Sequence, residues 1–365
     1  MSEPAAKQPK YFLLKALIFP VLVVPALVVT LLVIRGNEAE QLYYQALTAA
    51  ANNNFAEAAR FFERAESMGH AESSYNLALL YSSGVLDSAD PAALARKHLQ
   101  KAALNGSLSA EYELGKQAEY SRTPDYSQAA MHYRKAALGG HIEGLMALGR
   151  MHEKGLGVNQ SVLLAKEFYE KAAQSGNAEA NTLLAQLYYS GDLGKVDENA
   201  ALNYLHTAAE KGYPKAFTML GYIYERRSNS TDDRRKAAQY YQQAAEANDP
   251  DGMVNYGDFL QSENRLTEAL ELWLRAVDKY NHAPALHRLG VYYFKRQHPD
   301  YHAACQYFEQ AAKQGSAASW VNLGIMAEKG LGRKVDLAYA GECYRKAAEL
   351  GHADGKKLLE NLPDK

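Results

Sequence analysis

A pair of alanines closed by a glycine or an asparagine recurs along the chain, and this repeat limits the fold more than any other feature. It appears as QKAALNG, RKAALGG, EKAAQSG, HTAAEKG, QQAAEAN, EQAAKQG and RKAAELG. Gly140, Gly176 and Gly212 follow one another at intervals of 36 residues. Such a period is typical of stacked structural repeats, so the length of 365 residues does not translate into a number of globular domains.

Each repeat contains two stretches with the apolar spacing of an amphipathic helix. The run EGLMALGRMHEKG places apolar residues at i, i+3, i+4 and i+7 and ends at Gly155, a residue suited to a helix C-terminus. The run SVLLAKEFYEKAAQSG shows the same stripe and ends at Gly176. Leu-Gly pairs in the first stretch, such as those at Gly149 and Gly221, allow two helices to approach closely. We therefore predict an all-α fold of stacked αα-hairpins.

The motif A-x-x-x-L-G-x-x-Y-x-x-G-x-G-V, followed by A-x-x-W/Y-Y-x-K-A-A-x-x-G, resembles the Sel1-like repeat, a branch of the tetratricopeptide superfamily. The two most similar units are residues 145–176 and 320–351. The resemblance implies a right-handed αα-hairpin solenoid. The stretch 249–282 is shortened and lacks the alanine pair. The predicted parts are a tail (1–15), a transmembrane anchor (16–34), a tetratricopeptide-like N-terminal unit (36–70), the Sel1-like solenoid (71–352) and a C-terminal cap and tail (353–365).

The predicted anchor is the uncharged run ALIFPVLVVPALVVTLLVI at residues 16–34. A helix of this length spans about 28 Å, close to the roughly 30 Å hydrocarbon core of a bilayer. Three lysines precede the run and Arg35 alone directly follows it, so we expect residues 1–15 in the cytoplasm. The protein would then be a single-pass inner-membrane protein of a bacterium with its solenoid in the periplasm. A cleaved signal peptide is the alternative, although no A-x-A site follows the run.

Motifs for catalysis and metal binding give no candidate. The sequence contains no G-x-S-x-G, H-E-x-x-H or C-x-x-C motif, and its EKGLG runs lack the Lys-Ser/Thr pair of a phosphate loop. Cys305 and Cys343 are offset differently from their alanine pairs, so we expect no disulfide between them. His70 and His141 directly follow closing glycines and are expected in turns. We therefore predict no enzyme, no cofactor and no metal.

The charge balance and the tyrosines bear on the partners. With 40 Lys and Arg against 42 Asp and Glu, the chain lacks the basic excess of a nucleic-acid binder. The resemblance implies an adaptor for protein partners, and the anchor places it at the bacterial envelope, in an export, motility or signalling assembly. The 26 tyrosines motivate an alternative, a polysaccharide- or peptidoglycan-binding module, because aromatic rings stack on sugars. A hydrolase is a third class, which the missing cysteine pairs disfavour.

The resemblance also places partner-binding residues on the concave face, which the first helices line in tetratricopeptide-like hairpins. Positions two before, two after and five after the Leu of each Leu-Gly pair give these candidates: Tyr112, Arg150, Tyr189, Tyr222, Val254, His287, Val291, Phe294, Val321 and Ile325. The same positions hold Met146, Glu153, Gln186, Glu225, Asp258 and Glu328. The last three units form an apolar stripe that suits a partner helix or an extended peptide. Alternatively, its side chains pack between adjacent first helices.

A second group of aromatic residues falls in the second helix of the repeats. Tyr133, Tyr169, Tyr240, Tyr307 and Tyr344 are predicted to share one position there. We expect these rings to pack in the core with the hydroxyl at an edge.

Overall fold

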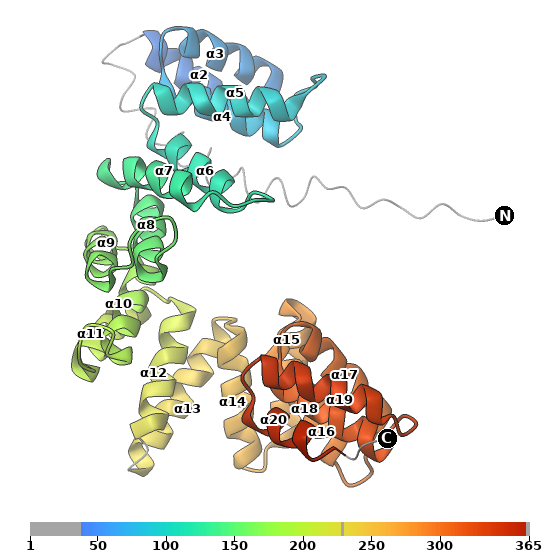
Figure 1. The fold of residues 1–365 in the computed structure, drawn as a ribbon. Coiled ribbons are helices and arrows are strands. Elements are labelled where there is room, and N and C mark those ends of the chain that lie inside the picture. The colour runs from blue at the N-terminus through green and yellow to red at the C-terminus, as the bar shows by residue number, and fades with distance from the viewer. Residues whose placement is uncertain (1–37, 228–229, 363–365) are drawn as a thin grey trace, which may run out of the picture. The chain divides into compact units, whose positions relative to one another are not determined.

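The computed structural model describes residues 38–227 and 230–362, and the described residues contain 19 helices and no strand (Figure 1). In chain order the helices are α2 (Glu38–Ala51), α3 (Phe55–Ser67), α4 (Ala71–Ser82), α5 (Pro91–Leu104), α6 (Leu108–Glu119), α7 (Tyr126–Leu138), α8 (Ile142–Lys154), α9 (Val162–Gln174), α10 (Ala178–Ser190), α11 (Glu198–Glu210), α12 (Pro214–Arg227), α13 (Thr231–Glu246), α14 (Pro250–Ser262), α15 (Leu266–Tyr280), α16 (Ala283–Lys295), α17 (Tyr301–Lys313), α18 (Ala317–Lys329), α19 (Leu337–Glu349) and α20 (Ala353–Glu360). The prediction of an all-α hairpin fold is confirmed for this part of the chain.

The helices alternate as the first and second helices of hairpins, from α2–α3 to α18–α19, and α20 follows the last hairpin. The predicted tail and anchor, residues 1–15 and 16–34, lie outside the described residues. None of the described helices is long and apolar enough to cross a membrane.

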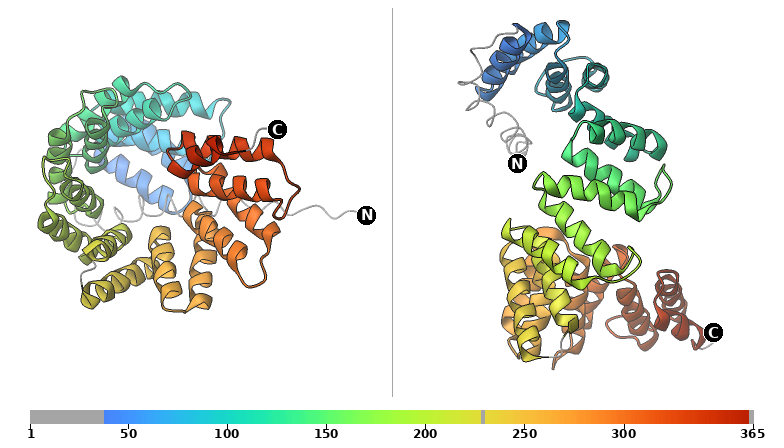
Figure 2. Two further views of the ribbon diagram at one scale, coloured as in Figure 1. Left: turned by 60° about the horizontal axis from the view of Figure 1, so that its bottom comes forward. Right: turned by 90° about the vertical axis from the view of Figure 1, so that its left-hand side faces the viewer.

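The described residues divide into two compact units, one that ends at Ala180 and one that begins at Asn181. Helices α2 to α9 belong to the first unit, α11 to α20 belong to the second, and the division falls within α10. Figure 2 shows the hairpins of each unit from two further sides. Within the second unit the first helix α14 also contacts the first helices α12 and α16, so the three present a shared face.

Local sequence explains where the helices begin and end. An Asp or Ser side chain accepts a hydrogen bond from the third backbone N–H of most second helices, as Asp125 does from Gln128. The residues that close the repeats adopt positive φ, including Gly106 (94°), Gly140 (87°) and Asn248 (65°). Gly155 ends α8 in the left-handed conformation, as the sequence predicts.

The glycine of each first-helix Leu-Gly pair faces a buried aromatic ring of the second helix, and so does Gly257, which follows Tyr256. A Cβ added at Gly221 would lie 2.5 Å from Cδ1 of Tyr241, so no larger residue fits without displacing the ring. The same pairing joins Gly115 to Tyr133, Gly149 to Tyr169, Gly257 to Trp273, Gly290 to Phe308 and Gly324 to Tyr344. The predicted close approach of paired helices at the Leu-Gly glycine is therefore confirmed.

In two repeats the buried aromatic position lies one residue beyond the predicted one. Tyr241 packs against Gly221 and Phe308 against Gly290. The predicted residues at these places are Tyr240 and Tyr307. One residue turns a helix by about 100°. Tyr240 and Tyr307 consequently lie half-buried at the edge of their hairpins.

Glycine-rich turns connect some hairpins to the preceding repeat. In the α8–α9 turn, Gly157 lies against the first residues of α7, and a Cβ there would lie 2.6 Å from the Ser127 backbone nitrogen. In the α18–α19 turn, Gly332 lies against Tyr301 at the start of α17. A glycine turn thus fills the space above the start of the preceding second helix.

Candidate functional site

The predicted concave-face residues of the first unit are partly used in packing. Tyr112 on α6 is half-buried, and its ring stacks on His141 with 5.1 Å between the ring centroids. Lys116 Nζ lies 5.4 Å from the centroid of the same ring. Arg150 on α8 is half-buried, whereas Met146, one turn earlier, is fully buried and not available to a partner.

The half-buried Tyr189 on α10 and the exposed Tyr222 on α12 form an aromatic pair in the second unit. Their rings meet edge to face with 6.1 Å between centroids, and Tyr222 retains 44% of its exposure. The guanidinium carbon of Arg226 lies 6.0 Å from the centroid of Tyr222. Burial raises the pKa of Tyr189, so its hydroxyl stays protonated and can donate a hydrogen bond. We call Tyr189, Tyr222 and Arg226 the tyrosine patch.

The apolar stripe predicted for the last units is buried at two positions and half-buried at three. Val254 is 4% exposed and Val321 is 8% exposed, which corrects their assignment as partner-binding residues. Val291 and Phe294 are half-buried against the cluster that contains Phe308. The half-buried Ile325 packs against the buried cluster of Ala327, Ala340 and Tyr344. The alternative in which the stripe packs between helices is therefore the one that the structure supports.

His287 also contributes to packing between first helices. Its Nδ1 lies 2.8 Å from Ser319 Oγ of α18, and its ring lies 5.6 Å from that of Phe308. Burial and the nearby positive charge of Arg288 lower the pKa of His287 to about 4. The ring is therefore neutral near pH 7 and links α16 to α18.

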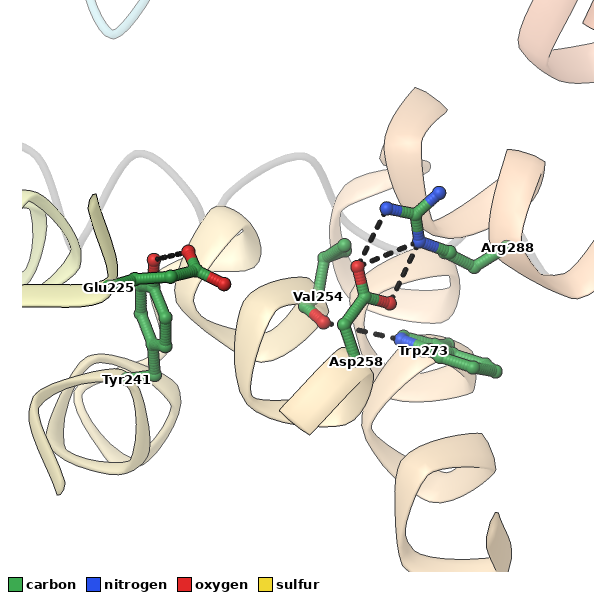
Figure 3. A network of polar contacts seen from close by, with 6 residues as sticks. All are labelled: Glu225, Tyr241, Val254, Asp258, Trp273 and Arg288. Atoms are coloured by element: carbon green, nitrogen blue, oxygen red, sulfur yellow. Dashed lines mark hydrogen bonds and ion pairs between the residues drawn. The ribbon is translucent and has the colours of Figure 1, made fainter. Parts of the chain in front are cut away.

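A set of polar contacts occupies the face of α12, α14 and α16 (Figure 3). Arg288 Nε lies 2.8 Å from both carboxylate oxygens of Asp258, and Nη2 lies 2.6 Å from Oδ2. The indole N–H of Trp273 points toward the backbone oxygen of Val254 at 3.4 Å. Asp258, a predicted partner-facing residue, is thus already bound to Arg288 of the next repeat.

Buried tyrosines in four hairpins donate hydrogen bonds to glutamates near the end of the first helix. Tyr169 donates to Glu153 at 2.7 Å. The other pairs are Tyr133 with Glu119, Tyr241 with Glu225 and Tyr344 with Glu328. Each glutamate lies four residues after the Leu-Gly glycine, and in the hairpins with Trp273 and Phe308 this position holds Gln261 and Phe294. Glu153, Glu225 and Glu328 therefore accept an internal hydrogen bond, which the concave-face prediction does not include.

A second kind of aromatic contact, which was not predicted, recurs between the two helices of a hairpin. In five hairpins an aromatic residue of the first helix stacks on one of the second helix, with centroid distances from 5.5 to 5.7 Å. The pairs are Tyr81 with His98, His152 with Phe168, Tyr188 with Tyr204, Tyr224 with Tyr240 and Tyr293 with Tyr307. The partner in the second helix always directly precedes the buried core position. This spacing accounts for many of the tyrosines without invoking a ligand.

Two open grooves lie where a hairpin turn is short or lacks glycine. The α4–α6 groove has a volume of about 900 Å³, and its lining includes Tyr81, Pro91, Arg96, Glu113, Lys116 and Tyr120. The α12–α14 groove has a volume of about 680 Å³, and its lining includes Glu225, Thr231, Arg234, Tyr241, Asp258 and Phe259. Both grooves lie over the start of a second helix, the place that Gly157 and Gly332 fill in other repeats.

The repeat unit found here matches the family model of the Sel1 repeat. The matched segments are residues 42–70, 71–107, 108–141, 142–177, 178–213, 214–249, 283–316 and 321–352, together well over half of the chain. The chain belongs to the Sel1 repeat family. The match includes residues 42–70, for which a tetratricopeptide-like unit was predicted. It leaves out residues 250–282, which belong to the shortened hairpin.

Solved Sel1 structures share the fold. A protective antigen of uropathogenic Escherichia coli with an SLR fold is 22% identical, with a TM-score of 0.66 over 89% of this chain and 73% of that one. A Sel1 repeat protein from Oxalobacter formigenes is 23% identical, with a TM-score of 0.56 over 93% of both chains. The curated relative "DAP3-binding cell death enhancer 1" of Rattus norvegicus is 40% identical over 74 residues, 20% of this chain and 14% of that protein. The chain therefore spans only a small part of that relative's length.

Sel1 repeat proteins are typically non-catalytic binding scaffolds. In the described part of this Sel1 chain, no three His, Cys, Asp or Glu side chains are grouped to hold a metal ion. Cys305 and Cys343 are both buried and not joined in a disulfide. Burial raises the pKa of Cys343 to about 11, so the thiol stays protonated.

Proposed function

We propose that this Sel1 repeat protein is a membrane-anchored adaptor that binds protein partners of a bacterial envelope assembly. The tyrosine patch carries the proposal, because Tyr222 remains 44% exposed although most other first-helix candidates are packed or paired internally. Two aromatic rings beside an arginine are the residue types that are enriched where proteins bind one another. The partner belongs to an assembly for export, motility or signalling.

The location rests on the sequence before residue 38. The uncharged run at residues 16–34 and the lysines that precede it favour an inner-membrane protein with the solenoid in the periplasm. Alkaline phosphatase fused after Lys365 should be active in cells, and a green fluorescent protein fused there should stay dark. The opposite pair of results would place the solenoid in the cytoplasm.

Site-specific photocrosslinking tests the tyrosine patch in membranes that contain the full-length protein. We expect a photoreactive phenylalanine analogue at Tyr222 to form one major adduct with a partner protein. The matched control carries the analogue at Tyr280, which is 39% exposed at the end of α15. Tyr222→Ala should prevent co-purification of the same partner without lowering the melting temperature. Equal adducts from both positions would contradict the assignment.

A glycan ligand is the second candidate, because the exposed ring of Tyr222 can stack on a sugar. Binding of full-length protein to purified peptidoglycan or to a glycan array, lost in Tyr222→Ala, would favour it. If the photoreactive analogue at Tyr222 still forms protein adducts and no glycan binds, the result supports the adaptor function.

A further inference from the structure

The α4–α6 groove is open because one hairpin turn is not built like its counterparts. In the α8–α9 turn, residues 155–161 read GLGVNQS, and Gly157 lies against the start of α7. The α6–α7 turn, residues 120–125, reads YSRTPD and contains no glycine. Of these residues, only Tyr120 lines the groove over the start of α5. The space above Pro91 and Ala92 is therefore left unfilled.

The chain itself shows what kind of group occupies this space. At the equivalent place above α7 and above α17, the occupant is a short polypeptide turn with a glycine against the helix backbone. The wall of the α4–α6 groove offers similar small groups, since Pro91, Ala92 and Ala95 line it. A polypeptide segment with a small residue at the point of contact fits the same place.

The charged side chains that line the groove determine whether a positively or a negatively charged ligand fits there. Lys116 Nζ pairs with Glu113 at 2.9 Å, so these two charges largely offset each other. Arg96 is exposed, and among the described residues its side chain has neither an ion pair nor a hydrogen bond. The groove thus presents one uncompensated guanidinium beside Tyr81 and Tyr120, the latter 71% exposed. A carboxylate can bind a guanidinium through two parallel hydrogen bonds.

The α12–α14 groove is less suited to an external ligand. Its Arg234 is bound by Glu263 at 2.8 Å and lies 5.7 Å from the ring centroid of Phe259. Its acidic residue Asp258 is held by Arg288. The charged groups of this groove are therefore already paired.

We propose that the α4–α6 groove binds a short acidic peptide segment of a partner protein, with a glycine or other small residue above Pro91 and a carboxylate on Arg96. The site is separate from the tyrosine patch, and it rests on the adaptor function only in that its ligand is a polypeptide. Its test requires neither the membrane topology nor an identified assembly.

The probe is a phage-displayed library of random heptapeptides, selected on the full-length protein in lipid nanodiscs and counter-selected on empty nanodiscs. Enriched peptides should contain Asp or Glu near a Gly, and they are then synthesised for affinity measurement. Arg96→Glu should weaken binding at least about tenfold, because it replaces a charge-assisted hydrogen bond by repulsion. Arg134→Glu, which changes an exposed arginine on α7 outside the groove, should alter affinity less than about twofold.

A third variant fills the groove from within the chain. Replacing residues 120–125 by the sequence GLGVNQS should abolish peptide binding. If melting curves show that this variant does not fold, Ala92→Trp replaces it, because Ala92 is exposed on the groove wall. A library that yields no enriched peptide overturns the proposal, as do peptides that bind wild type and Arg96→Glu equally or that still bind the filled groove. Failure of Tyr222 crosslinking would affect only the proposed adaptor surface.

Discussion

At the scale of single residues, the Sel1 core depends on a three-part contact between a glycine, an aromatic ring and a carboxylate. The ring of Tyr169 packs on Gly149 and its hydroxyl donates to Glu153. This arrangement lets a large ring be buried while its polar atom is satisfied at the hairpin edge. Where the ring is Trp273 or Phe308, no glutamate is needed and none stands at the corresponding position.

Tyr169→Phe tests the contribution of this hydrogen bond. We expect the free energy of unfolding to fall by about 1–2 kcal/mol, because the Glu153 carboxylate loses a charge-assisted donor while the ring still fills its place. Urea unfolding of wild type, both single variants and the Tyr169→Phe, Glu153→Gln double variant gives the coupling energy. Additive effects of the two substitutions would contradict a direct interaction.

His287 should make stability depend on pH. Its pKa is lowered to about 4 by burial and by Arg288, whereas an unfolded histidine titrates near 6.5. As the pH falls from about 6.5 to about 4, the unfolded state binds a proton that the folded state does not, so stability decreases. We expect a loss on the order of 1–2 kcal/mol, less than the full shift implies because the ring is only half-buried.

Urea unfolding at pH 7 and pH 4.5 checks this expectation. His287→Gln should lose less stability than wild type over that interval, and His302→Gln, which changes an exposed histidine on α17, should follow wild type. Parallel losses in wild type and His287→Gln would show that other groups cause the pH dependence.

At the scale of elements, the turns determine how closely successive hairpins pack. Gly157 and Gly332 place their turns directly on the preceding second helix. The α14–α15 turn has only the residues 263–265 between its helices and leaves the α12–α14 groove open. Turn sequence therefore decides whether the edge of a repeat is sealed or accessible.

Gly157→Ala and Gly194→Ala separate two costs of replacing a turn glycine. Both positions have positive φ, 65° and 101°, so each substitution introduces backbone strain on the order of 1 kcal/mol. Only Gly157 faces backbone of the preceding helix, while a Cβ at Gly194 meets no atom within 4 Å. We expect Gly157→Ala to lower the melting temperature clearly more than Gly194→Ala. Equal shifts would mean that strain alone matters at these turns.

At the scale of the whole molecule, each Sel1 hairpin packs mainly on its neighbours in sequence, and contacts between distant hairpins are not needed within a unit. Stability in such repeat proteins is approximately a sum of local terms. Damage to one hairpin should therefore spread first to the adjacent hairpins of the same unit.

Gly221→Leu tests this locality in the second unit. The added side chain would collide with Tyr241, and overpacking of this kind costs typically about 1–3 kcal/mol. Hydrogen exchange should rise in α12, α13 and α14 and change little in α18 and α19. Lys215→Leu, which adds a leucine at an exposed position of α12, is the matched control. A uniform rise across α12 to α19 would indicate global instead of local unfolding.

The repeat, the helical hairpins and the glycines that hold them together are predictable from sequence alone. Periodic apolar positions and the Leu-Gly pairs specify these features locally, because helix formation and close helix approach depend on residues within one repeat. The predicted αL position of Gly155 follows from the same local pattern. The anchor at residues 16–34 is likewise a sequence prediction, and it lies outside the described residues.

Which first-helix side chains are available to a partner depends on packing between helices and is not evident from the repeat pattern. Val254 and Val321 share their repeat position with the half-buried Tyr112 and His287, yet neighbouring helices cover the two valines almost completely. Tyr241 takes the core position predicted for Tyr240. The sequence does not distinguish these two adjacent tyrosines, and Tyr241 is the one whose ring packs against Gly221. Likewise, the grooves depend on whether a turn reaches the preceding repeat. The burial of a side chain depends on the repeats that pack against it, so it cannot be predicted from the sequence pattern of one repeat.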